Sequence, residues 1–444
     1  MGSIGRKGWR RKALAALALF FLPAHPAYPA LSGSSALSAQ IPFEQAARDL
    51  ASTDPGTRLK AARLLKEAGY PEAAVPLAAL VIDPMDEVQL EAIAAELNIF
   101  LAERIVPRKR IGFVVEVRNQ VMAEPAFASG PLAAGPRPVP GEVLNALRTA
   151  SRDDNPRVAL EALYAFGVLA AEPAGAARRE LLRVSGPELA AFVGVPDPAL
   201  RYAAVRVIGR LFAKRAQDDP IEESVGDAVI TALNDPDRSV KGEAMQTLGT
   251  LRYTRGVQAL TDLFQYHGKG QSAEAALDAI ARIAHSASAP LFTAQLAAKS
   301  GALRGIAVDG LARLGDAAHL DAIQTAVAAD HSDSMALSGA FASAMLSGGP
   351  LTPIAEALTR PRLRDQAWQY LVELAPGRSS MFTQQLQDPD PRIRTDVIDA
   401  LALGGDAAAL PLVERALTDR DPQVMKAAER AAARLKASAQ KPVS

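Results

Sequence analysis

The segment Leu386–Leu401 (LQDPDPRIRTDVIDAL) is followed 31 residues later by a second copy, Leu417–Ala432 (LTDRDPQVMKAAERAA). Both copies contain an Asp-Pro turn, at Asp390-Pro391 and at Asp421-Pro422, followed by apolar residues at helical spacing. Self-similarity with a period of roughly 30 residues is the sequence signature of a helical repeat array. This stretch therefore predicts the architecture of the chain before any single helix is assigned.

The same period extends through much of the chain. Leu233–Leu248 (LNDPDRSVKGEAMQTL) aligns with Leu386–Leu401 at an offset of 153 residues, close to five repeats. A pair of helices of this length cannot bury enough apolar surface to fold alone, so neighbouring pairs must stack. We expect the first helix of each pair to bury one recurrent apolar residue, at Leu248, Ile280, Leu311, Phe341, Leu371, Leu401 and Ala432. The matching positions of the second helices are Leu263, Leu296, Val327, Leu358, Leu386 and Leu417.

Asp-Pro pairs and glycines predict where these helices begin and end. An aspartate accepts hydrogen bonds from free amides at a helix start, and proline is suited to the first turn. We therefore expect first helices to open at Asp54-Pro55, Asp83-Pro84, Asp197-Pro198 and Asp235-Pro236. Glycines at 209, 249, 315 and 404 follow the first helices, as C-terminal positions prefer.

These units resemble the HEAT-like repeats of the phycobilisome-lyase type. The resemblance rests on Asp235-Pro236, Val240, Ala244 and Leu248-Gly249, and on Asp388-Pro389, Ile393, Val397 and Leu401. It implies an all-α fold, a right-handed α-solenoid of about eleven HEAT-like helix-turn-helix repeats. Lyases of this class act on bilin chromophores, so the resemblance also implies that such a groove can hold a ligand.

One interval breaks the period. Residues 107–141 contain the basic cluster Arg108, Lys109 and Arg110, a β-branched run, and a stretch rich in proline and glycine. Two interpretations stay open: a degenerate repeat with a long loop, or a loop that contacts a partner. The predicted organisation is a signal peptide and flexible segment at 1–39, repeats at 40–106, this insertion at 107–141, a repeat solenoid at 142–437 and a tail at 438–444.

The N-terminus predicts export. Five basic residues between Arg6 and Lys12 precede the short apolar run Ala13–Leu22, and prolines follow it, which is the order of a secretory signal peptide. The run is shorter than the roughly 20 residues that span a bilayer, so we expect no stable membrane insertion after cleavage. The alternative is a membrane tether through an uncleaved 13–31 segment. The predicted location is the bacterial periplasm or the exterior.

Charge and composition exclude several classes of function. Removing the five basic residues of the signal changes the balance from 49 basic and 49 acidic residues to 44 and 49. This mildly acidic chain lacks the basic excess of a nucleic-acid-binding protein, so we expect no nucleic acid partner. Cysteine is absent, which excludes disulfides and thiol chemistry. No His-Glu pair is present, unlike in the di-iron deoxyhypusine hydroxylases, so we predict no metal and no cofactor.

The sequence therefore predicts a non-catalytic exported scaffold that binds another protein through the solenoid surface. The candidate partner-binding residues are Arg108, Lys109 and Arg110 in the insertion, and Tyr253, Arg255 and Tyr266, an aromatic and basic concentration further along the chain. The alternative function is a groove-based enzyme that handles a small molecule or chromophore, in the manner of a lyase.

Overall fold

The structure is a computed structural model that describes residues 43–102, 123–135, 137–171, 175–213, 221–404 and 407–439. The chain divides into two units, Met1–Pro42 and Phe43–Ser444, and all of the described residues belong to the second. The predicted signal peptide and the basic cluster Arg108–Arg110 lie outside the described residues. The domain boundaries and the number of repeats stay predictions.

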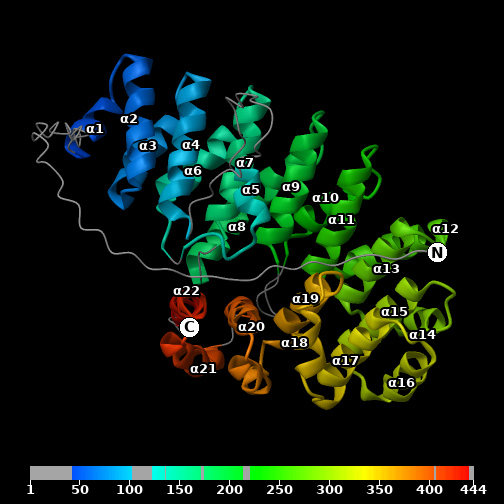
Figure 1. The fold of residues 1–444 in the computed structure, drawn as a ribbon. Coiled ribbons are helices and arrows are strands. Elements are labelled where there is room, and N and C mark those ends of the chain that lie inside the picture. Colours follow the sequence, from blue (N-terminus) through cyan, green and yellow to red (C-terminus); the bar gives the residue numbers. More distant parts are fainter. Residues whose placement is uncertain are drawn as a thin grey trace, which may run out of the picture. The chain divides into compact units, whose positions relative to one another are not determined.

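The second unit is all-α, as predicted (Figure 1). Among the described residues the only β pairing is an isolated bridge between Leu101 and Ala134. The first helices of the pairs pack on one another in sequence. They are α2 (Pro55–Ala68), α4 (Asp86–Phe100), α7 (Pro156–Leu169), α9 (Pro198–Leu211), α11 (Arg238–Leu251), α13 (Gln271–Ile283), α15 (Gly301–Leu314), α17 (Asp333–Ser347), α19 (Arg364–Leu374), α20 (Pro391–Gly404) and α22 (Pro422–Ala439). We call them the first-helix layer.

Except for α8, which has 18 residues, the second helices are mostly shorter than the first helices, and they often begin or end in a 3-10 turn. They are α3 (Ala74–Ala78) with η2 (Ala79–Ile82), α6 (Gly141–Ala150), α8 (Gly175–Phe192), α10 (Glu223–Ala232), α12 (Val257–His267), α14 (Ala289–Gln295), α16 (Leu320–Ala329), α18 (Thr352–Ala357), η6 (Ser379–Phe382) with η7 (Gln385–Gln387), and α21 (Leu410–Arg415). Two helices stand outside this scheme: α1 (Phe43–Asp49) at the start, and α5 (Ala123–Ala128) in the predicted insertion.

The predicted core positions are confirmed for the first helices. All of the recurrent residues from Leu248 to Ala432 are buried. The prediction for the second helices is wrong at five of six positions, because only Leu358 is fully buried. The buried residue lies about one turn earlier in each unit, at Leu260, Phe292, Ile323, Ile354, Phe382 and Val413.

Two of the four glycines predicted to end first helices have a different role. Gly315 is the C-cap of α15, with a φ of 76°, as expected. Gly209 and Gly249, however, lie inside α9 and α11. A Cβ on Gly209 would lie 2.9 Å from Thr247 Oγ1, and one on Gly249 would lie 3.1 Å from Ala279 Cα. These two glycines therefore let adjacent first helices approach closely.

Some of the predicted helix caps are confirmed. Asp54 and Asp197 accept hydrogen bonds from the amides of Thr57 and Ala199, and Pro55 and Pro198 begin the helices. Asp83 and Asp235 are not caps, contrary to the prediction. Each stands two residues before the N-cap residue, and its carboxylate accepts the amide of that residue.

Four arginines use these aspartates to join consecutive repeats. Each arginine lies four residues after the N-cap residue of a first helix, and its guanidinium donates two hydrogen bonds to the aspartate that precedes the next first helix. The pairs, each with a shortest N–O distance of 2.6 Å, are Arg58–Asp83, Arg201–Asp235, Arg304–Asp330 and Arg394–Asp419. We call these contacts the inter-repeat clamps.

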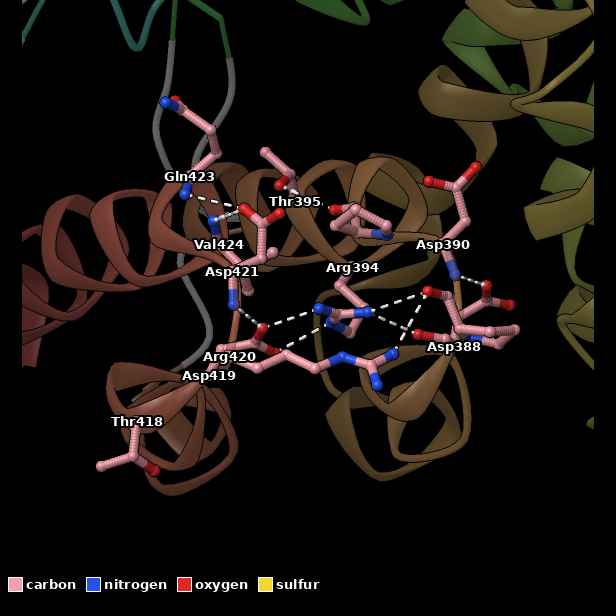
Figure 2. Close-up of polar contacts among 12 residues, drawn as sticks. Asp388, Asp390, Arg394, Thr395, Thr418, Asp419, Arg420, Asp421, Gln423 and Val424 are labelled. Atoms are coloured by element: carbon pink, nitrogen blue, oxygen red, sulfur yellow. Dashed lines mark hydrogen bonds and ion pairs between the residues drawn. The ribbon is translucent and has the colours of Figure 1, made fainter. Parts of the chain in front are cut away.

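Each clamp also holds the turn before its own helix. Nη1 of Arg394 donates to the carbonyls of Asp388 and Pro389, and Figure 2 shows this guanidinium between the two turns. The hydrogen bond from Arg304 lowers the pKa of Asp330 to about 2. Hydrogen bonds from Arg201 and Arg394 likewise lower the pKa of Asp235 and of Asp419. The planar fork of arginine fits this two-bond geometry, whereas lysine supplies one point charge.

Replacing Arg394 by lysine is expected to destabilise the protein by about 1.5–3 kcal/mol, because the half-buried Asp419 carboxylate loses one of its two charged hydrogen bonds and two carbonyls lose their donor. The free energy of unfolding in urea is the measurement. Arg392→Lys, an exposed change in the same helix, is the control. Equal stabilities for the two variants would contradict a clamp role for Arg394.

Candidate functional site

The insertion places a segment of the chain on the first-helix layer. The insertion lies in the sequence between α4 and α6, the two helices of one pair. The described part of the insertion includes Ala123–Gly135, which contains α5, and α5 packs on α7. We call Ala123–Gly135 the cis segment. Its end is paired with the end of α4: the Ala102 amide donates to the Ala133 carbonyl at 2.8 Å, and the Gly135 amide to the Phe100 carbonyl at 2.7 Å.

Phe127 anchors the cis segment in a socket between α7 and α9. The ring is 4% exposed and lies 5.3 Å from the ring of Tyr164, centroid to centroid. Gly167 forms the floor: a Cβ there would be 2.7 Å from the Phe127 ring and 2.8 Å from Val207. Only glycine leaves room for the aromatic ring at this close approach.

Two arginines of α9, one helical turn apart, cover this socket. The Arg210 guanidinium lies 3.5 Å from the centroid of the Phe127 ring and donates to the Phe127 carbonyl. Arg206 donates to the Tyr164 hydroxyl at 3.3 Å and pairs with Glu124 at 3.5 Å. Burial, with the neighbouring positive charge of Arg206, lowers the pKa of Arg210 to about 10. Cation–π contact and a carbonyl thus hold a half-buried guanidinium that pairs with no carboxylate in the described part of the chain.

Contacts further along the cis segment reach the last helix of the array. At its start, the Ala123 amide donates to Glu161 of α7 at 2.9 Å. Gly130 has a φ of 93°, a left-handed conformation that suits glycine, and turns the chain after α5. The Pro131 carbonyl then accepts a hydrogen bond from Arg434 of α22 at 3.3 Å, 303 residues away in sequence. The cis segment therefore bridges α7 and α9 to α22.

A cleft of about 340 Å³ lies beside this bridge. Its walls are Leu101, Ala102 and residues 129–133 on one side, and Trp368, Asp399, Leu403 and Arg430 of α19, α20 and α22 on the other. Burial raises the pKa of Asp399 to about 6, although Arg430 stands 4.0 Å away. A carboxylate with a raised pKa in a cleft of this volume is typical of small-molecule sites.

Other buried charges lie in the first-helix layer. Asp309 and Arg313 of α15 contact Tyr370 and Glu373 of α19: the Tyr370 hydroxyl donates to Asp309, and Arg313 pairs with Glu373 at 2.7 Å. Burial raises the pKa of Asp309 to about 6. Glu96 of α4 is fully buried, and among the described residues its carboxyl oxygens have no hydrogen-bond partner. Burial alone raises the pKa of Glu96 to about 9, so this side chain is neutral at pH 7.

Two of the partner-binding residues predicted from sequence come together. Tyr253 donates to Asp227 at 2.8 Å, and Arg255 pairs with Glu223 and Asp227, which joins the start of α12 to α10. Tyr266, at the opposite end of α12, is 84% exposed and stacks edge-on with His267. Arg108, Lys109 and Arg110 lie outside the described residues. A role for any of the six in partner binding stays a prediction.

Sequence reasoning missed the residues that hold the cis segment. Arg206 and Arg210 are one turn apart on a first helix, and Glu124 and Phe127 are one turn apart in the insertion. These spacings are visible in the sequence. Nothing local to either stretch indicates that they face each other.

Within the described ranges, no group of three or more His, Asp or Glu side chains is placed to hold a metal ion. None of the helices described is both long and apolar enough to cross a bilayer.

The sequence model for HEAT repeats matches residues 186–268 and 379–443. These two stretches are HEAT repeats. No curated protein matches the sequence significantly.

Several solved structures show a weak similarity to this chain. An engineered protein is 20% identical, with 89% of this chain and 98% of that chain covered and a TM-score of 0.41. The CpcE–CpcF complex of phycocyanin lyase from Nostoc is 17% identical, with 56% and 94% covered and a TM-score of 0.37. Importin beta is 14% identical, with 88% and 50% covered and a TM-score of 0.35. At these TM-scores the likenesses assign no function to this chain.

Proposed function

We propose that this protein is an exported, non-catalytic scaffold that binds a partner protein on the first-helix layer. The observation that supports it most is the cis segment, because the layer already holds a stretch of polypeptide. It does so with a socket for one aromatic ring, with side-chain donors to the Phe127 and Pro131 carbonyls, and with a side-chain acceptor for the Ala123 amide. Solenoids present long surfaces of this kind by stacking alone.

Export to the periplasm or the exterior is the second part of the proposal. It rests on the basic and apolar order of residues 6–22. Intact-mass analysis of the protein from its native host tests it. We expect the mass of a chain whose first residue lies between positions 31 and 40. A mature chain that retains Met1 and sediments with membranes would instead support a tether.

One observation favours a second function, a small-molecule or chromophore-handling site. The cleft beside Trp368 has the volume and the raised-pKa carboxylate of a ligand pocket. In that case a small molecule should co-purify with the protein, and its retention should fall when Asp399 is replaced by asparagine.

A crosslinking pull-down from an envelope extract tests the scaffold function. The mature protein should capture a reproducible set of proteins, and an Arg206→Glu/Arg210→Glu variant should lose them while retaining its helical circular dichroism. A matched control, Arg378→Glu/Arg392→Glu, changes the same charge outside the socket. Equal capture by wild type and the socket variant would contradict binding on this face.

A further inference from the structure

We infer that the socket of α7 and α9 recognises a partner segment with an acidic and an aromatic residue one helical turn apart, and that the cis segment occupies this socket until the partner displaces it. This inference rests on the proposed scaffold function. It adds the chemistry of the partner and names the residues that compete with it.

The shape of the socket defines the aromatic requirement. Gly167 leaves a space that the Phe127 ring fills, and Tyr164 lies at the side of that ring. An aliphatic side chain in this position would give up the contact of the ring face with the Arg210 guanidinium, 3.5 Å from the centroid. The site is therefore selective for an aromatic residue.

The charges of the socket define the acidic requirement. Arg206 and Arg210 bring two guanidinium groups to the site. Glu124 lies 3.5 Å from Arg206, and Glu243 of α11 also interacts with Arg206 electrostatically, so the guanidinium without a carboxylate in the described residues is that of Arg210. Arg210 has only a carbonyl and a ring, and burial depresses its pKa. A partner that brings a second carboxylate would give Arg210 the charged hydrogen bond that the cis segment does not supply. Such a partner binds more tightly, contact for contact, than the chain's own segment.

The spacing of the cis segment defines the backbone conformation. Glu124 and Phe127 are three residues apart in α5, so both side chains project toward α9 from one helical turn. The Phe127 carbonyl, at the end of the same turn, accepts from Arg210. A partner must therefore present its acid and its aromatic residue from a helical turn whose last carbonyl can accept a hydrogen bond from Arg210.

Because the cis segment is part of the chain, it competes at a high effective concentration. A tethered ligand of this length acts at an effective concentration on the order of millimolar, so it masks the socket from a dilute partner of similar intrinsic affinity. Weakening the cis segment should expose the socket without changing it.

The test uses a fluorescent, acetylated peptide of residues 123–135 (AEPAFASGPLAAG) and measures anisotropy with the full-length protein. Wild type is expected to bind it weakly. A Glu124→Gln/Phe127→Ala variant, with its own segment disabled and its socket intact, should bind at least about 10-fold more tightly. Adding Arg210→Met to that variant should remove the gain, as should replacing the phenylalanine of the peptide by alanine.

A second variant tests the inference without a change in the core, in case the Phe127→Ala variant does not fold. Glu124 is 46% exposed, so Glu124→Lys places a repulsive charge beside Arg206 without disturbing the core, and it should unmask the socket in the same direction. Circular dichroism confirms that each variant is folded. Folded variants that bind the peptide no better than wild type, or a gain that survives Arg210→Met, would overturn the inference. Partners captured in the pull-down despite that result would leave the scaffold function standing and remove only this account of the partner.

Discussion

Replacing Leu401 by alanine is expected to lower the free energy of unfolding by about 2–5 kcal/mol, and Leu311→Ala should have an effect of the same size. Both side chains are fully buried at the same position of different first helices, where they face the neighbouring repeats. Truncation removes apolar contacts and leaves a cavity that a closely packed helical layer cannot collapse to fill. Urea unfolding followed by circular dichroism measures both values.

A surface leucine-sized residue provides the matched control. Ile82 is 51% exposed at the end of the first repeat, so Ile82→Ala should cost less than about 0.5 kcal/mol. If Leu311→Ala and Leu401→Ala were as mild as this control, the repeat register that places them in the core would be incorrect.

Replacing Glu96 by glutamine is expected to stabilise the protein by about 3 kcal/mol at pH 7, with a gain that depends on pH. Burial raises the pKa of Glu96 from 4.5 to about 9. Between these values the folded state holds a proton that the unfolded state has released. Raising the pH through this window therefore favours unfolding of the wild type by about 1.4 kcal/mol per pH unit, and glutamine removes this dependence.

The difference in stability between Glu96→Gln and wild type should thus be small at pH 4.5, grow up to about pH 9 and then level off. Glu87→Gln, an exposed change in the same helix, is the control. A difference that stays constant between pH 5 and pH 8 would show that Glu96 titrates normally and is not desolvated.

The periodicity of the sequence was sufficient to predict the buried positions of the first-helix layer, because each of these helices buries a full face against both neighbours. The second helices gave less information. Leu296 follows the end of α14, and Leu386 lies in a 3-10 turn. The last apolar residue of these second helices is therefore not the residue that packs in the core. Phe292 and Phe382, one turn earlier, fill the core instead. Short helices offer too few turns for a period to identify the buried face.

The inter-repeat clamps were hidden by a local explanation. An aspartate before a proline, such as Asp235 before Pro236, is typical of a helix cap. That interpretation accounted for Asp235 without its ion pair with Arg201 of the preceding repeat. A constant offset was nevertheless available, because Arg58, Arg201, Arg304 and Arg394 all lie four residues after their N-cap position. The aspartates recur at less regular distances, since insertions lengthen some repeats.

The cis segment shows where sequence reasoning ended. The loss of period at 107–141 marked an insertion, and its proline and glycine content indicated irregular chain. Its position depends on contacts with Glu161, Arg210 and Arg434, which are far apart in sequence and belong to three helices. Non-local contacts of this kind leave no pattern in a single sequence.

The most direct test of the account is the contact between the cis segment and the last helix. The chain has no cysteine, so Pro131→Cys and Arg434→Cys introduce a unique pair of thiols. In the wild type, the Arg434 side chain lies 3.3 Å from the Pro131 carbonyl oxygen. A short bismaleimide should join the two thiols within one folded chain, and the product should disappear in urea. A pair at Pro131 and the exposed Tyr266 is the control. If both thiols are modified in the folded protein but never crosslinked, the cis segment does not bridge the first-helix layer and the proposed binding face is incorrect.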